Sequence, residues 1–168
     1  LIAGNGTKGM FDLQNSAAAI VHPRGGAIWQ ISPDWAKRTV WAHGFRNAYD
    51  FDFAPDHAID TFDSDGERDI TLPWYRPTRV FRVRQGDDAG WISRSWKRPN
   101  HDPEMPDVLA EFGRGSPTGV LRYRHRRLPK RFHHGLFVLD WTFGRILFVG
   151  DDGKTERVAR PGGCLLYT

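Results

Sequence analysis

Short runs of aromatic and β-branched residues recur along the chain, and clusters of Gly, Pro, Asp and Asn separate them. Residues 49–53 (YDFDF) alternate aromatic with acidic positions, which is the period-two pattern of a strand with one buried face. The few segments compatible with a helix are short and interrupted by proline. The pattern therefore predicts an all-β chain. We expect strands at residues 27–32, 39–43, 49–53, 58–62, 78–84, 108–112, 119–123, 136–141 and 145–149.

This pattern of strands is repeated. Residues 44–66 and residues 115–149 each contain an opening turn with glycine, an aromatic strand, a loop and an apolar strand that ends in aspartate. Repetition at this scale, with such short strands, favours the blades of a β-propeller, each a four-stranded antiparallel sheet. A blade takes about 40–45 residues, so the chain holds about three to four blades. We therefore expect one domain over residues 1–168, a partial propeller with an irregular segment at residues 1–22 and an incomplete last blade at residues 150–168.

Composition and charge narrow the classes of function. No apolar run reaches the roughly 20 residues that a membrane helix needs, so we expect no membrane span in this chain. The formal net charge is +4, and much of the excess lies between Arg122 and His134. A basic run can bind anionic polymers, but aromatic residues are sparse in it and no nucleic-acid-binding motif accompanies it. We therefore expect a solvated loop and no nucleic-acid partner. Cys164 is the only cysteine, which excludes an internal disulfide or a thiolate metal cluster.

A candidate ligand-binding turn lies at Gly44-Phe45-Arg46-Asn47, where a repeat begins. Arginine offers a planar fork of donors to a carboxylate or phosphate, and asparagine offers both a donor and an acceptor. Together Arg46 and Asn47 suit an anionic, oxygen-rich ligand. In the next repeat Arg114 occupies a similar opening turn, so we expect the two arginines to face the same rim. Alternatively, Arg46 pairs with a neighbouring aspartate and Asn47 caps a turn.

Four carboxylates lie within seven residues around Gly66, which permits a sharp bend. Calcium takes roughly six to eight oxygen ligands, and backbone carbonyls or water can complete such a shell. The spacing differs from that of an EF-hand loop, because the distal glutamate and the flanking helices are missing. The alternative is an acidic surface turn that Arg68 and Arg76 neutralise. The candidate metal ligands are Asp63, Asp65, Glu67 and Asp69.

Aromatic and charged residues close to these motifs form a candidate ligand wall. Two prolines stiffen a segment that carries adjacent aromatic residues and an arginine, and an Asp-Trp pair ends the corresponding strand of the next repeat. Core packing is the ordinary role of such aromatic residues, and it is the alternative here. The candidate wall residues are Trp74, Tyr75, Arg76, Asp140 and Trp141.

Taken together, these motifs resemble those of a known family. Between about Pro23 and Val149 the chain contains GFRN, FDSDGERD, LPWYRPTRV, DAGW, GRGSPTG and LDWTFGRI. This set is similar to bacterial propellers described as membrane-bound dehydrogenases, which are related to the soluble PQQ-dependent glucose/sorbosone dehydrogenases. The resemblance implies a fragment of a six-bladed propeller that is exported to the periplasm or the extracellular space. It also implies an oxidoreductase acting on a sugar or polyol, with the quinone contacted by Arg46 and Asn47, calcium held by the acidic loop, and a c-type cytochrome segment in the full-length protein.

This sequence departs from that family in three ways, one of which is that arginines expected in a later blade have no clear counterpart in residues 157–160. The resemblance places the histidine that takes the proton from the sugar hydroxyl upstream of this chain, and neither His22 nor His43 replaces it, so the catalytic residues stay unassigned. A cofactor-contacting lysine that the family predicts near Thr142 is also absent. Two hypotheses follow. The first is a quinone-dependent dehydrogenase, and the second is a non-catalytic propeller that has lost the cofactor and binds carbohydrate or protein.

Overall fold

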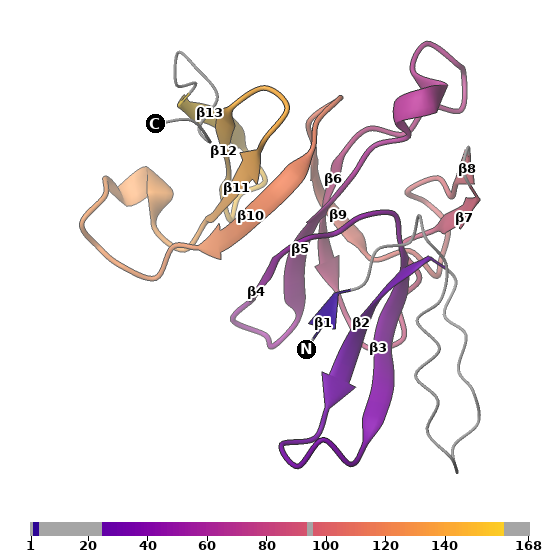
Figure 1. The fold of residues 1–168 in the computed structure, drawn as a ribbon. Coiled ribbons are helices and arrows are strands. Elements are labelled where there is room, and N and C mark those ends of the chain that lie inside the picture. Colours follow the sequence, from indigo (N-terminus) through magenta and orange to yellow (C-terminus); the bar gives the residue numbers. More distant parts are fainter. Residues whose placement is uncertain (1, 4–24, 94–95, 160–168) are drawn as a thin grey trace.

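The computed structural model describes residues 2–3, 25–93 and 96–159, and these residues form strands joined by turns (Figure 1). They contain no α-helix, and none of them belongs to a helix long and apolar enough to cross a membrane. Two short 3-10 turns, η2 (Glu67–Asp69) and η3 (Lys130–Phe132), lie in long connections. The strands are β1 (Ile2–Ala3), β2 (Gly26–Ile31), β3 (Arg38–Phe45), β4 (Phe51–Phe53), β5 (Ile59–Asp63), β6 (Arg79–Val83), β7 (Trp91–Ser93), β8 (Trp96–Lys97), β9 (Asp107–Glu111), β10 (Pro117–Arg122), β11 (Leu136–Asp140), β12 (Arg145–Val149) and β13 (Thr155–Ala159).

Most of these strands form two four-stranded antiparallel sheets in which neighbours in the sequence are also neighbours in space. The first sheet has the order β4-β5-β6-β9, and the second has the order β10-β11-β12-β13. A three-stranded sheet, β1-β2-β3, precedes them, and the small β7-β8 hairpin is inserted between β6 and β9. Consecutive four-stranded antiparallel sheets of this kind are the blades of a β-propeller. The prediction of an all-β, partial propeller is therefore confirmed (Figure 1).

All the strands predicted from the sequence are present, each with bounds close to those expected. Strands β1, β7, β8 and β13 are not apparent from the apolar pattern. Residues 2–3 pair with β2, inside the segment expected to be irregular, and residues 4–22 lie outside the described residues. Strand β13 completes the second sheet, so residues 155–159 do not begin the expected incomplete blade. Its residues 155–158 are exposed and three of these four are polar, which explains why the apolar pattern does not reveal the strand.

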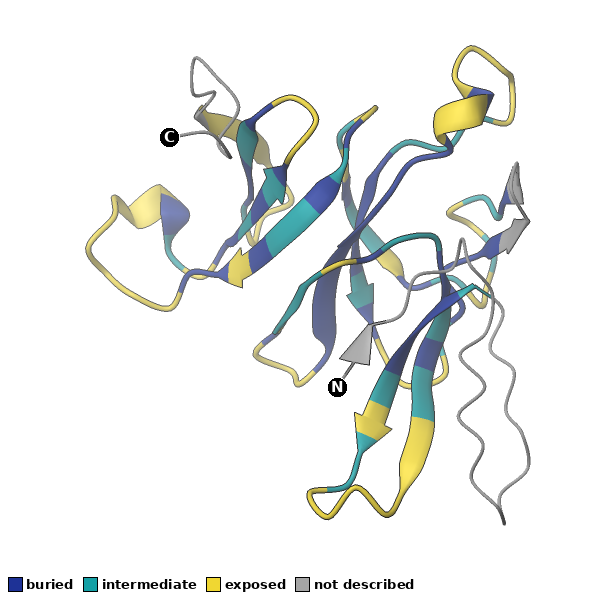
Figure 2. Cartoon of the chain, viewed as in Figure 1, coloured by how far each residue is buried: buried dark blue, intermediate teal, exposed yellow. Residues whose placement is uncertain are grey.

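The first four-stranded sheet is buried on both faces, because it lies between the β2-β3 hairpin and the second sheet (Figure 2). On β6, Phe81 and Val83 share a core with Ile28 of β2. Val80 instead shares a core with Val138 of β11. Successive side chains of a strand point to opposite faces, so one strand supplies both cores. This double burial accounts for valine and phenylalanine at three of the five positions of β6, RVFRV.

Carboxylates next to β4 close the open edge of β10. The backbone N–H of Val120 donates to Asp50 Oδ2 at 3.0 Å, and the backbone N–H of Arg122 donates to Asp52 Oδ2 at 2.8 Å. An edge strand otherwise leaves such N–H groups unpaired. The two hydrogen bonds therefore satisfy the edge of the second sheet and hold it against the first.

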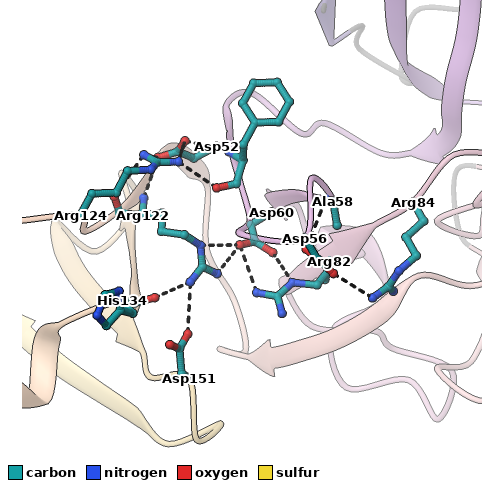
Figure 3. Close-up of polar contacts among 11 residues, drawn as sticks. Asp52, Asp56, Ala58, Asp60, Arg82, Arg84, Arg122, Arg124, His134 and Asp151 are labelled. Atoms are coloured by element: carbon teal, nitrogen blue, oxygen red, sulfur yellow. Dashed lines mark hydrogen bonds and ion pairs between the residues drawn. The ribbon is translucent and has the colours of Figure 1, made fainter.

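A buried ionic cluster centred on Asp60 also joins the two sheets (Figure 3). Asp60 lies on β5 and is fully buried. It accepts hydrogen bonds from Arg82 Nε of its own sheet at 3.0 Å and from Arg122 Nε of the second sheet at 3.1 Å. The Arg122 guanidinium also pairs with Asp151 at 3.2 Å. One carboxylate therefore binds cations from both blades.

Candidate functional site

The GFRN turn is folded around the carboxylate of Asp63. Gly44 has a φ of +79°, and a Cβ at this position would lie 1.9 Å from a neighbouring carboxylate oxygen, so the turn requires glycine. The backbone N–H groups of Arg46 and Asn47 donate to Asp63 Oδ2 and Oδ1 at 3.1 and 2.8 Å. Asp63 is the fully buried last residue of β5. The backbone of the motif therefore binds a carboxylate of the protein itself.

The side chain of Arg46 lies at the outer edge of this turn. Its guanidinium pairs with the half-exposed Glu67 at 3.3 Å and lies over the ring of Trp91, 5.7 Å from the ring centroid. Trp91 is almost fully buried at the start of β7. A guanidinium over an indole face is a favourable cation–π contact. Arg46 is thus oriented by an aromatic surface on one side and by an exposed carboxylate on the other.

A buried lysine completes the site. Lys97 of β8 is almost fully buried, and its Nζ lies 3.2 Å from Asp63 Oδ2 and donates to the carbonyl of Ser64. The same Nζ lies 5.8 Å from the centroid of the Trp91 ring. Burial lowers the pKa of Lys97 to about 8, Asp63 opposes this effect, and the charge of Arg79 adds to it. Lys97 and Arg46 therefore converge on Trp91, and Lys97 is held there by the buried carboxylate of Asp63.

The second blade repeats this arrangement without the lysine. Asp140 ends β11 as Asp63 ends β5, and it accepts hydrogen bonds from the backbone N–H of Ser116 at 2.8 Å and from Arg145 Nε at 2.7 Å. Arg145 is directly opposite Asp140 in the strand register. In this blade the carboxylate is thus neutralised by an arginine of the neighbouring strand.

In the first blade the equivalent arginine, Arg79, forms its hydrogen bonds with residues other than the carboxylate opposite it. Arg79 is opposite Asp63 in the register, but its Nη1 donates to Asn100 Oδ1 at 2.9 Å and to the carbonyl of Arg98 at 3.2 Å. Arg79 is fully buried, and its Nε and Nη2 have no hydrogen-bond partner among the described residues. The inserted Lys97 neutralises Asp63 instead. This departure from the repeat marks the first-blade turn as the candidate functional site.

The structure does not gather the four predicted metal ligands into one shell. Asp63 is held by the GFRN turn, Asp65 accepts a hydrogen bond from the Tyr75 hydroxyl at 2.9 Å, and Glu67 pairs with Arg46. The fourth predicted ligand, Asp69, lies in η2. In the part of the chain that the structure describes, no group of three or more His, Cys, Asp or Glu residues converges to hold a metal ion. The calcium prediction does not fit this arrangement, because three of the carboxylates already have protein partners.

The predicted ligand wall is divided between the two blades. Tyr75 binds Asp65, and burial together with this hydrogen bond raises the pKa of the Tyr75 hydroxyl, while the charge of Arg114 acts in the opposite direction. Arg76 is partly buried, and its Nε has no partner among the described residues. In the second blade Asp140 is the buried structural carboxylate described above. Trp74 and Trp141 are exposed in the first and second blades, at 45% and 52%.

The sequence pattern gives little sign of Trp91, Arg79 and Lys97. Trp91 and Lys97 lie in the β7-β8 insertion, which interrupts the repeat between the third and fourth strands of the first sheet. The insertion itself is the feature of the sequence that could have pointed to these residues, because a segment that interrupts a repeat is not needed to complete the sheet and can carry functional residues. Nothing in its composition, however, identifies the partner of Lys97, which is 34 residues away in the chain.

Solved structures of sugar dehydrogenases share this fold. The PQQ-bound form of an aldose sugar dehydrogenase from Streptomyces coelicolor matches with a TM-score of 0.58 and 13% identity, over 82% of this chain and 40% of that chain. A glucose dehydrogenase matches with a TM-score of 0.55 and 17% identity, over 79% of this chain and 41% of that chain. The apo-form of the soluble aldose sugar dehydrogenase from Escherichia coli matches with a TM-score of 0.51 and 14% identity, over 73% of this chain and 37% of that chain.

These comparisons establish the architecture. At identities of 13–17% the likeness shows a shared propeller fold, and this chain spans about 40% of the length of the structures that it matches. No protein-family model and no curated protein matches the sequence. The function must therefore be argued from the residues of the site.

Proposed function

We propose that this chain supplies cofactor-binding blades of an exported, quinone (PQQ)-dependent dehydrogenase that acts on a sugar or polyol. The observation that carries the proposal is the convergence of Arg46 and buried Lys97 on Trp91, at a turn where the inserted lysine replaces the arginine of the repeat. The propeller fold shared with sugar dehydrogenases supports the same class of activity.

The residues of the first-blade turn fit such a cofactor. PQQ is a planar anion with several carboxylates, and a guanidinium beside an indole ring offers both charge and a flat surface. The buried Nε and Nη2 of Arg79 and the Nε of Arg76 are donors without partners among the described residues, and a bound carboxylate would satisfy groups of this kind. A quinone held by these residues would supply a hydride acceptor for the oxidation of an alcohol.

The side chains of this chain then have distinct roles in the proposal. Arg46 and Asn47 bind the anionic cofactor, and Arg114 approaches it from the second blade. Lys97 and Asp63 fix the backbone of the turn through their mutual ion pair. The base that accepts the proton of the substrate hydroxyl is placed outside this chain. The full-length protein is accordingly proposed to be a six-bladed propeller of the periplasm or the extracellular space that passes electrons to a c-type cytochrome segment.

Thermal unfolding of the full-length protein during a PQQ titration tests this proposal. A ligand present at a hundred times its dissociation constant adds about 2.7 kcal/mol to the free energy of unfolding, which is readily measured. We expect an upward shift that Arg46→Ala abolishes, followed by oxidation of a sugar with an artificial electron acceptor. The titration is run in calcium and in chelator. A shift confined to calcium would show that the cofactor brings a metal ion that the carboxylates of this chain do not hold alone.

A second candidate function is a non-catalytic propeller that binds carbohydrate or protein. The observation that favours it is at Thr142, where the family predicts a cofactor-contacting lysine. The Thr142 hydroxyl donates to Ser116 Oγ at 2.7 Å instead, so it serves the local turn. Absence of any shift at saturating PQQ would favour this candidate over the dehydrogenase.

A further inference from the structure

The connection between β10 and β11 is a basic loop (residues 123–135) with its own hydrophobic support. The basic loop contains five Lys and Arg residues, three His and no Asp or Glu. Tyr123 and Phe132 are buried and share a small core with Phe148 of β12. The backbone N–H of Leu128 donates to the Tyr123 hydroxyl at 2.8 Å. These contacts support the backbone of the basic loop, from which the exposed cations project.

Most cations of the basic loop are exposed and not neutralised. Arg124 pairs with Asp52 at 2.7 Å, and Arg131 pairs with the exposed Glu156 at 3.4 Å. The basic loop projects from the second sheet on the side away from the η2 segment, so it is separate from the first-blade turn (Figure 1). No carboxylate within residues 25–93 and 96–159 forms an ion pair with the three remaining cations, Arg126, Arg127 and Lys130.

A cleft of about 530 Å³ lies between the basic loop and the β12-β13 hairpin. Its size falls within the range of about 300–1,000 Å³ that is typical of small-molecule sites. Arg131 lines it from the basic loop, and Asp151, Lys154, Thr155 and Glu156 line it from the hairpin. The cleft therefore combines cations, carboxylates and a hydroxyl.

We propose that the cleft and the basic loop together bind an acidic polysaccharide, with one sugar ring in the cleft and the carboxylates of neighbouring units on the basic loop. Asp151 and Glu156 are acceptors for sugar hydroxyls. The two cations of the cleft are already paired, Arg131 with Glu156 at 3.4 Å and Lys154 with Asp152 at 2.7 Å. The uronate carboxylates therefore bind the cations of the basic loop that have no such partner. Asp151 is held in place by Arg122, at 3.2 Å. This surface is independent of the proposed cofactor site.

The same observations disfavour nucleic acid as the partner. Carboxylates in the cleft accept hydrogen bonds from the hydroxyl groups of a polysaccharide, whereas the phosphate backbone of double-stranded DNA offers them no hydroxyl donors. Proteins that bind single strands stack the bases on exposed aromatic side chains, but Tyr123 and Phe132 are buried in the support of the basic loop. A site that acts by charge alone would bind DNA and a uronate polymer with similar affinity. Comparing the two ligands therefore distinguishes charge attraction from specific binding of a polysaccharide.

Binding of polygalacturonate to the full chain tests the proposal, with neutral dextran and double-stranded DNA as comparisons. We expect polygalacturonate to bind and dextran not to bind. Arg126→Gln combined with Arg127→Gln should weaken polygalacturonate binding about tenfold, because exposed ionic contacts are lost together. The matched control, Lys37→Gln combined with Arg38→Gln, removes an adjacent pair of exposed charges from the β2-β3 hairpin and should change nothing.

A variant that fills the cleft separates recognition from simple charge attraction. Thr155→Tyr places a large side chain in the cleft at the first position of β13, where an aromatic residue is compatible with a strand. It should weaken polygalacturonate binding and leave any DNA binding unchanged. The proposal is overturned if polygalacturonate does not bind, or if it binds no better than DNA and is insensitive to Thr155→Tyr.

Discussion

Replacing Asp60 by asparagine removes the buried carboxylate at which Arg82 of the first four-stranded sheet and Arg122 of the second meet (Figure 3). Asp60 is fully buried and accepts hydrogen bonds from Arg82 and Arg122, whose side chains are 24% and 4% exposed. Asparagine is close in size, but it is neutral, and its amide nitrogen cannot accept a hydrogen bond from a guanidinium. The substitution therefore leaves two guanidinium groups next to each other without their shared counter-ion.

The expected loss of stability is about 3 kcal/mol. Removing one partner of a buried ion pair costs about 3–5 kcal/mol, because the remaining charge is left uncompensated. We place the loss at the lower end of this range, because Arg122 keeps its ion pair with Asp151 at 3.2 Å and Arg82 is partly exposed. The matched control is Asp56→Asn, which removes a half-exposed partner of Arg84 at 3.3 Å. An exposed pair of this kind contributes about 0–1 kcal/mol.

Urea denaturation of the two variants and the parent chain measures this difference. We expect Asp60→Asn to lower the midpoint strongly with an unchanged slope, since the folded and unfolded surfaces stay the same. Added salt should reduce the small effect of Asp56→Asn and leave the larger effect of Asp60→Asn almost intact, because buried charges are screened less. A loss below about 1 kcal/mol for Asp60→Asn, equal to that of the control, would refute the role of this cluster.

Two further substitutions test the turn that carries the candidate site. Gly44→Ala should destabilise the fold by about 3 kcal/mol in a denaturation experiment, since its Cβ would combine left-handed strain with a contact of 1.9 Å to a carboxylate oxygen. Gly113→Ala has a similar φ of +74° but open space around its Cβ, so it should cost only about 1–2 kcal/mol; equal losses would argue against the contact. Between pH 8 and 10.5 the unfolded chain binds more protons at Lys97 than the folded chain does, so the free energy of unfolding should rise with pH across that window. Lys97→Met should abolish this rise in pH-dependent unfolding, whereas Lys37→Met, at an exposed lysine, should retain it.

The strands and their repeat were accessible from the sequence because they depend on local pattern. Strand β6 carries apolar residues on both faces because these contribute to two cores. The aspartates that end β5 and β11 occupy equivalent positions in the two blades. Strand β13 could not be predicted from the pattern, because an exposed outer strand shows no alternation of apolar and polar residues.

The composition of the candidate site depends on contacts between distant segments, which local pattern does not encode. Lys97 meets Asp63 across 34 residues, and Arg122 meets Asp60 across 62 residues. The four carboxylates of the predicted calcium loop likewise have separate surroundings in the structure. Closely spaced carboxylates at the end of a strand point in different directions, and partners from other elements, such as Lys97 and Tyr75, bind them separately.

In the proposed function, the first-blade turn binds an anionic quinone. Calorimetric titration of the full-length protein with PQQ, compared with Arg46→Ala, tests it most directly. We expect saturable binding that Arg46→Ala weakens by about ten- to a hundredfold, as is usual when a charged hydrogen-bonding partner is lost. Absence of binding, or equal affinity in the two proteins, would contradict the assignment of this turn as a cofactor site.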